Sequence, residues 1–316
     1  MINALSYVMD TTDELTSNLE ELGYRVRIAS IDHLPMLKKQ IEEQHNQGLL
    51  DDQFYQERLA WFRFEIPNSL QNAKSLISVA VPRPQTRAVF TWNGNRCPLI
   101  IPPTYTGYNI IAKRVESLLE GILSKKGYKL ARTKLPLKLL AARSGLVQYG
   151  RNNISYVSGM GSFFELVAFY SELPCELDDW KEATMMKQCE SCELCRLACP
   201  TGAILSNRFL LRAERCITYQ NEKKGDVPFP DWLAGSWHNS LEGCMRCQIA
   251  CPVDKPFREW VGEEEEFSEE ETLLLLSGTS IDKLAKETIG KLERLDILAD
   301  LNILPRNLGC FFRKHE

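Results

Sequence analysis

The sequence lacks any long apolar run. None of its stretches approaches the roughly 18 to 20 consecutive apolar residues that cross a bilayer as a helix. Its first residues, MINALSYVMDTTDEL, also lack the basic segment, the apolar segment and the small-residue cleavage site of a secretory leader. We therefore expect a cytoplasmic protein with no membrane partner.

The sequence also lacks an excess of positive charge. Its 38 Lys and Arg residues are outnumbered by 42 Asp and Glu residues, which gives a formal net charge of -4. A surface built mainly to bind nucleic acid would be basic, although a local basic patch remains compatible with this balance. With 316 residues, 44% of them hydrophobic and 25% charged, the chain is long and apolar enough for an ordinary globular fold of two or three structural units.

Cysteine, in contrast, is abundant. In a long chain without a secretory signal, cysteines bind metal or carry out redox chemistry more often than they form disulfides. Eight of the eleven cysteines lie between Cys189 and Cys251, while Cys97, Cys175 and Cys310 are scattered over the rest of the chain. This concentration predicts a metal-binding module.

The first cysteine motif is CESCELCRLACP, from Cys189 to Pro200. Its gaps of two, two and three residues before a proline are those of bacterial ferredoxins, in which the fourth cysteine ligates the other 4Fe-4S cluster. Two-residue gaps let the backbone curl around one cluster, with amide N–H groups turned toward its sulfurs. The longer gap and the proline direct the fourth thiolate elsewhere, so a second motif is expected downstream.

That second motif is Cys244-x2-Cys247-x3-Cys251-Pro252, and Cys216 is the only other cysteine between the two motifs. Zinc also accepts paired cysteines, and eight cysteines could form two zinc sites. The spacing and the reciprocal partner favour two 4Fe-4S clusters instead. We assign Cys189, Cys192, Cys195 and Cys251 to one cluster, and Cys199, Cys216, Cys244 and Cys247 to the other.

Ahead of these motifs, helical and extended patterns alternate, which is typical of an α/β layer. A basic run from Lys125 to Arg143 contains no acidic residue, and it is either a solvated face or a rim for an anionic ligand. After the cysteines, EEEEFSEEE reads as a solvated linker before a helical stretch from Ile281. We predict helices over 9–23, 34–64 and 110–125, strands over 24–31 and 76–81, and two strands within 154–171.

Several segments together resemble the epoxyqueuosine reductase family and, more distantly, the reductive dehalogenases. Besides the cysteine motifs, the similarity includes NAKSLISVAVPRP, YTGYN, AARSGLVQYGRNNISYV, GMGSFFELVAFYSELP and RCITY. It extends from about residue 20 to residue 256. The cysteine motifs are highly specific for a two-cluster module, whereas the upstream segments match less closely.

This resemblance implies an α+β protein of three parts. Residues 1–180 would form a nitroreductase-like α/β cobalamin-binding domain, and 181–260 a ferredoxin-like module with two 4Fe-4S clusters. Residues 261–316 would form the acidic linker and a short helical C-terminal segment. The cofactors implied are the two clusters and a cobalamin, whose cobalt receives electrons from the nearer cluster and reduces a substrate.

The resemblance also implies residues of the cobalamin pocket. These residue types have ordinary readings as well: glycines form turns, tyrosines pack and asparagines cap loops. The candidates are Tyr105, Gly107, Tyr108, Asn152, Asn153, Gly161 and Ser162.

One departure from the family concerns the proton donor. Epoxyqueuosine reductases carry a general-acid aspartate in an Asp-Ser/Thr-x-Pro stretch, but ARTKLP places Thr133 there, and no Asp or Glu occurs between Glu120 and Glu165. A proton would have to come from elsewhere, for example from Tyr149, Arg151 or a lysine, although arginine is a poor proton donor.

We therefore expect a cobalamin- and iron-sulfur-dependent reductase of an unidentified small substrate, with an electron donor such as ferredoxin or flavodoxin. The alternative is an electron-transfer protein that reduces a partner, for instance a corrinoid protein, and has no substrate of its own. Reduction of epoxyqueuosine in tRNA is the least expected activity. The acid is missing, the net charge is negative, and no helical-repeat extension follows the clusters.

Overall fold

The computed structural model describes residues 2–312, with side chains from residue 8 onward. It divides into two compact units. Unit 1 comprises Met1–Pro82 and Tyr108–Cys192, and unit 2 comprises Arg83–Gly107 and Glu193–Glu316. The sequence predicted three consecutive parts; the structure differs because residues 83–107 leave the first unit and join the C-terminal one.

Unit 1 is built on a four-stranded antiparallel sheet in the order β1-β2-β8-β5. Its two central strands are almost wholly buried, so their apolar side chains face packed layers on both sides of the sheet. The strands predicted at 24–31 and 76–81 are confirmed as β1 and β2. The bounds are β1 Arg25–Ser30, β2 Ser75–Pro82, β5 Leu130–Arg132 and β8 Phe164–Ser171.

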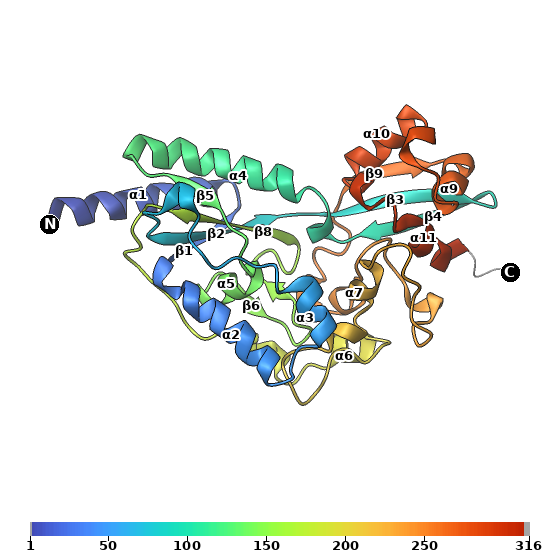
Figure 1. Cartoon of the computed structure of the whole chain (residues 1–316), viewed down its shortest axis with the longest axis horizontal. Helices are drawn as coiled ribbons and strands as arrows, with labels where there is room; N and C mark the ends of the chain where they lie inside the picture. The colour runs from blue at the N-terminus through green and yellow to red at the C-terminus, as the bar shows by residue number, and fades with distance from the viewer. Residues whose placement is uncertain (1, 313–316) are drawn as a thin grey trace. The chain divides into compact units, whose positions relative to one another are not determined.

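Helices cover both faces of this sheet (Figure 1). On one face, α1 (Ile2–Glu21) and α4 (Tyr108–Leu123) pack Leu15, Leu19 and Val115 against the strands. On the other face lie α2 (Leu34–Asn46) and α5 (Leu137–Arg143).

The helix predicted over 34–64 is wrong in its extent. The chain breaks at Gly48, whose φ of +67° suits glycine, and resumes as α3 (Asp52–Arg58). The side chain of Asp51 caps α3 by accepting a hydrogen bond from the Phe54 backbone N–H at 2.9 Å.

Unit 2 contains a three-stranded sheet in the order β4-β3-β9. β3 (Gln85–Trp92) and β4 (Asn95–Ile101) form a hairpin whose turn residues, Asn93 and Gly94, both have positive φ, as a type I′ turn requires. β9 (Val261–Phe267) pairs in parallel with β3. The acidic linker predicted here is therefore partly a strand.

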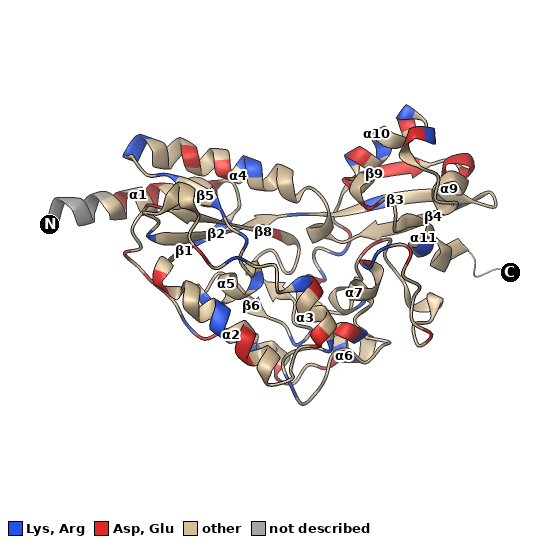
Figure 2. Cartoon of the chain, viewed as in Figure 1, with Lys and Arg blue, Asp and Glu red and all other residues tan. Residues whose placement is uncertain are grey.

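Ion pairs explain how this acidic strand is tolerated. Glu264 pairs with Arg87 at 2.9 Å, Glu266 with Arg96, and Glu265 with Arg294. Figure 2 shows the red acidic residues of β9 among blue basic residues. Each such pair near the surface contributes little alone, but together they offset the repulsion within the strand.

Three helices cover the sheet of unit 2: α9 (Glu269–Leu276), α10 (Lys286–Arg294) and α11 (Leu304–Phe312). They bury Leu292, Leu304 and Leu308 against Phe90 and Phe267 of the strands. Three short helices carry the cysteine-rich segment: α6 (Leu194–Ala198), α7 (Ile217–Asn221) and α8 (Arg246–Ile249). No helix in the described part of the chain is long and apolar enough to cross a membrane.

We expect Gly225→Ala to destabilise unit 2 by about 1 to 3 kcal/mol. A Cβ at this position would lie 1.8 Å from the backbone oxygen of Asn302, which cannot rotate away. As a control, Gly121→Ala in α4 adds a methyl group to open space and should preserve or raise stability. Thermal unfolding of the two variants checks this, and equal unfolding midpoints would contradict the close packing.

Candidate functional site

The eight clustered cysteines are distributed over both units. Cys189 and Cys192 close unit 1, and the other six belong to unit 2. Cys189 and Cys195 are buried, while the rest are partly exposed. The boundary between the units falls inside the first motif, so the cluster assigned to Cys189, Cys192, Cys195 and Cys251 remains a prediction from the sequence.

Within unit 2, the structure brings together the four cysteines assigned to the second cluster. Burial raises the pKa of Cys247 well above its usual range, and the nearby Cys244 and Cys216 raise it further, as do Cys195, assigned to the other cluster, and Cys199. The pKa of Cys244 is raised to about 12, again mainly by burial and then by Cys216 and Cys199. A metal bound here would hold these thiols as thiolates.

Single metal ions and four-iron clusters need differently spaced ligands. Among the described residues, no group of three or more Cys, His, Asp or Glu side chains gathers closely enough to hold one metal ion. A zinc site would need four ligands at about 2.0 to 2.3 Å from one centre. A four-iron cluster is larger, and each of its irons takes one thiolate, so its ligands stand further apart.

In unit 1, a short hairpin lies against the first cysteine motif. It consists of β6 (Gln148–Tyr149) and β7 (Ser155–Tyr156). The Tyr149 N–H donates to the Thr184 carbonyl at 3.0 Å, and the Met186 N–H donates to the Tyr149 carbonyl at 2.8 Å. The segment that leads to Cys189 is thereby attached to β6.

Arg151 extends this attachment to the cysteines themselves. Its guanidinium donates to the carbonyls of Cys189 at 2.7 Å, Cys192 at 2.9 Å and Glu190 at 3.1 Å. The sequence had raised Arg151 as a proton donor, but these contacts direct it to backbone carbonyls, and a guanidinium does not release its proton in proteins.

Tyr149, the other catalytic candidate, is buried in an apolar cluster with Ala141, Val157 and Met160. Burial raises the pKa of its phenol well above the usual value. It therefore holds its proton more tightly than an ordinary tyrosine. Thr133, at the position of the missing acid, is buried too, and its hydroxyl has no hydrogen-bond partner among the described residues.

Five of the predicted cobalamin residues belong to unit 1. Asn152 is buried and donates to the Tyr156 hydroxyl at 2.9 Å, while its Oδ1 accepts from the Ile154 N–H at 3.2 Å. Asn153 and Gly161 have positive φ of 59° and 58°, and Ser162 is buried. Tyr108 is the first residue of α4.

A buried carboxyl near Tyr108 was missed by the sequence reasoning. Burial raises the pKa of Tyr108, and the charge of Glu165 on β8 raises it further. Glu165 is only 6% exposed. The available signal was a single acidic residue in the apolar run FFELVAFY, which is unusual for a buried strand.

The other two candidates, Tyr105 and Gly107, have structural tasks in unit 2. The Tyr105 hydroxyl donates to the Glu222 carboxylate. Gly107 has φ of +74° and its N–H donates to Asp296 at 2.5 Å, while a Cβ there would lie 2.6 Å from the Arg83 guanidinium. Only glycine suits this position.

Tyr105 borders a group of carboxylates that no sequence pattern revealed. The pKa of Glu242 is raised to about 8, mainly by burial and then by Asp300, Glu222 and Asp296. These four residues come from three distant segments, so their proximity arises only from folding.

Part of the basic run is neutralised by ion pairs within unit 1. Lys126 lies 3.5 Å from Glu14, Arg132 pairs with Glu116 at 2.7 Å, and Arg143 pairs with Glu182. The exposed lysines of the run are Lys125, Lys129, Lys134 and Lys138.

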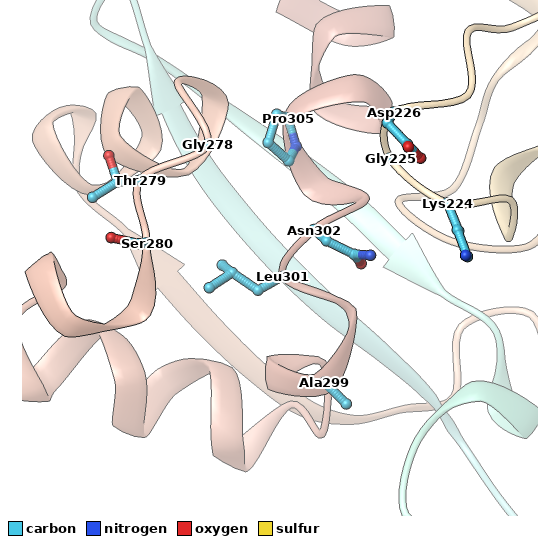
Figure 3. A pocket seen from close by; sticks show the side chains of 10 residues that line it. All are labelled: Lys224, Gly225, Asp226, Gly278, Thr279, Ser280, Ala299, Leu301, Asn302 and Pro305. Atoms are coloured by element: carbon cyan, nitrogen blue, oxygen red, sulfur yellow. The ribbon is translucent and has the colours of Figure 1, made fainter.

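A hollow of about 870 Å³ lies between the loops of unit 2 (Figure 3). Lys224, Thr279, Ser280 and Asn302 are among its lining side chains. None of the residues that line this hollow is a predicted cluster ligand or a predicted cobalamin residue.

A family model for a 4Fe-4S double cluster binding domain matches residues 188–254. This range contains both cysteine motifs in full, together with Cys216. The chain therefore carries a domain for two 4Fe-4S clusters. This match favours clusters over the alternative of two zinc sites.

Curated relatives extend the similarity beyond the cysteines. Epoxyqueuosine reductase of Staphylococcus aureus is 28% identical over 258 residues, which cover 77% of this chain and 66% of the relative. Epoxyqueuosine reductase of Bacillus subtilis is 29% identical over 196 residues, or 59% of this chain and 49% of the relative.

Solved structures show the same fold. A structure of epoxyqueuosine reductase from Bacillus subtilis superposes with a TM-score of 0.68 at 22% identity, over 96% of this chain and 81% of that one. This chain is similar to epoxyqueuosine reductases in sequence and in fold. The aligned regions span two thirds or less of the length of these curated relatives.

These epoxyqueuosine reductases bear on two expectations from the sequence. A crystal structure of epoxyqueuosine reductase with an epoxyqueuosine-modified tRNA stem loop matches with a TM-score of 0.66 at 22% identity. The expectation of a small substrate finds no support in these names, and the judgement that tRNA is unlikely conflicts with them. Net charge does not exclude such a partner, because it does not report how charge is distributed over a surface.

Cys216 provides a test of the ligand assignment, because it lies outside both motifs. We expect Cys216→Ala to lower the iron content of anaerobically purified protein from about eight to about four per chain, through loss of one cluster. The control is Cys175→Ala, since Cys175 lies outside both motifs and its thiol donates to the carbonyls of Ile28 and Leu177. Unchanged iron in the Cys216 variant would refute the assignment.

Proposed function

We propose that this chain is an iron-sulfur oxidoreductase that removes the epoxide oxygen of epoxyqueuosine in tRNA. The observation that carries the proposal is the combined match to proteins of that name, in sequence over 77% of the chain and in fold over 96% of it. Removal of an epoxide oxygen as water consumes two electrons and two protons. The double-cluster domain suits this demand, because its clusters pass electrons singly.

Cobalamin is the proposed site of reduction. When bound, it would supply the cobalt that reduces the substrate, while the protein positions it and excludes water. The candidates in unit 1 to hold it are Tyr108, Asn152, Asn153, Gly161 and Ser162.

The chemistry of unit 1 fits such a ligand. Ser155 and Thr133 are buried, and their hydroxyls have no hydrogen-bond partner among the described residues. Buried hydroxyls normally find partners, so they are available to a polar ligand or to water. A corrinoid is rimmed by amide groups, which both donate and accept hydrogen bonds.

The exposed lysines of the basic run are proposed to contact the tRNA backbone. Lys125, Lys129, Lys134 and Lys138 carry positive charge on the unit that holds these candidates. Phosphate contacts of this kind would make binding weaken steeply as salt increases.

One observation favours a second function. Thr133 stands where the family's general acid is expected, burial raises the pKa of Tyr149, and Arg151 donates to a backbone carbonyl. An electron-transfer protein that reduces a partner protein needs no such donor.

The direct test uses anaerobically purified protein, reconstituted with cobalamin and reduced by a chemical one-electron donor. We expect it to convert epoxyqueuosine to queuosine in tRNA, as detected by nucleoside analysis. Conversion of the free nucleoside alone would overturn the tRNA assignment. Reduced clusters and cobalt with no conversion of either substrate would support the electron-transfer function.

Position 133 separates the two functions further. A buried aspartate has a raised pKa and can act as an acid. If Thr133 occupies the acid position, we expect Thr133→Asp to raise the rate of epoxide reduction by about 10-fold or more. Thr133→Asn, of similar size but without an acidic proton, should not. Equal rates for both variants would show that protons arrive from elsewhere.

A further inference from the structure

Within unit 1, the segment Tyr149–Asn153 contacts the first cysteine motif and the residues just before it. Tyr149 is hydrogen-bonded through its N–H and its carbonyl to Thr184 and Met186. Two residues further along, Arg151 reaches the carbonyls of Cys189 and Cys192. The contacts therefore run in the same chain direction along residues 149–151 and along residues 184–192.

The shape of this segment leaves little freedom for Arg151. A Cβ on Gly150 would lie 2.4 Å from the Asn152 side-chain oxygen and 2.6 Å from the Tyr156 ring. Asn152 is itself fixed by its bonds to the Tyr156 hydroxyl and the Ile154 N–H. The turn that carries the guanidinium is thus tightly packed, and it positions that group in advance.

The guanidinium also determines how the peptide groups of the motif are oriented. In a trans peptide unit, the C=O and N–H groups point in opposite directions. Because Arg151 holds the Glu190 carbonyl at 3.1 Å, the N–H of Ser191 points away from the guanidinium. Arg151 therefore holds these carbonyls on one side of the cysteine loop, so that N–H groups and thiolates can face the other side.

A fixed positive charge beside Cys189 and Cys192 has an electrostatic consequence. Adding an electron to a cluster makes it more negative, and a nearby cation stabilises that state more than the oxidised one. Net charge and hydrogen bonding around a cluster are among the factors that set its reduction potential.

We propose that Arg151 is the positioning residue of the cluster ligated by Cys189 and Cys192. It shapes the cysteine loop through three carbonyls and raises the reduction potential of that cluster through its charge. This inference rests on the double-cluster domain and not on the substrate, so its failure would leave the proposed reductase function standing.

The test compares Arg151→Gln and Arg151→Lys with the unaltered protein, purified anaerobically with its clusters. Redox titration followed by electron paramagnetic resonance measures the midpoint potential of each cluster. We expect Arg151→Gln to shift one potential to more negative values and to leave the other unchanged. Arg151→Lys keeps the charge, so its potential should stay nearer to that of the unaltered protein.

Arg27→Gln is the matched control, because Arg27 is also an arginine of unit 1 that donates to a backbone carbonyl, that of Val26 at 2.8 Å. It should leave both potentials unchanged. If Arg151→Gln binds only about four iron while the control keeps about eight, the positioning role is supported directly. Two unshifted potentials and full iron in both Arg151 variants would overturn the proposal.

Discussion

Thiolates held close together repel one another, and the cysteine-rich domain depends on how that repulsion is offset. In unit 2, burial raises the pKa of Cys244 and Cys247, and the nearby Cys216 and Cys199 raise it further. Iron provides the main compensation, because metal binding to deprotonated thiols contributes to folding. Cysteines that lie in short helices and turns can converge in this way only if their backbone is held by the rest of each unit.

The two units provide that support by different means. Unit 1 has a buried antiparallel sheet, and its β6–β7 hairpin is hydrogen-bonded to the segment before Cys189. Unit 2 has a sheet in which an acidic strand is neutralised by arginines, and its helices pack on Phe90 and Phe267. In both, irregular cysteine segments are attached to regular structure, so cofactor ligands can lie in loops without being poorly positioned.

Periodicity and spacing predicted the parts of the structure that depend on local sequence. The apolar run at Leu76–Val81 and the amphipathic pattern at 110–125 correspond to β2 and α4. The x2-x2-x3-Pro spacing indicated a double-cluster domain, which the family model confirms. Local sequence could not show that residues 83–107 join the C-terminal unit, because strand pairing over that distance depends on tertiary packing.

The acidic segment from Glu263 to Glu271 was misread for a related reason. Its charge favours solvent when considered alone, but Arg87, Arg96 and Arg294 reach it from other parts of the chain. Arg151 is a similar case, since a single arginine in a Gly-Arg-Asn-Asn stretch gives no signal of three carbonyl partners about forty residues away. Both features arise from pairings that only the fold brings about.

We infer that each of the two 4Fe-4S clusters takes cysteine ligands from both motifs. Electron paramagnetic resonance of the fully reduced native protein tests it most directly. Two clusters that each take a cysteine from the other motif lie close together. We therefore expect about two spins per chain, with a spectrum broadened by magnetic interaction between the two clusters. A spectrum of one isolated cluster, or of two clusters that do not interact, would contradict it.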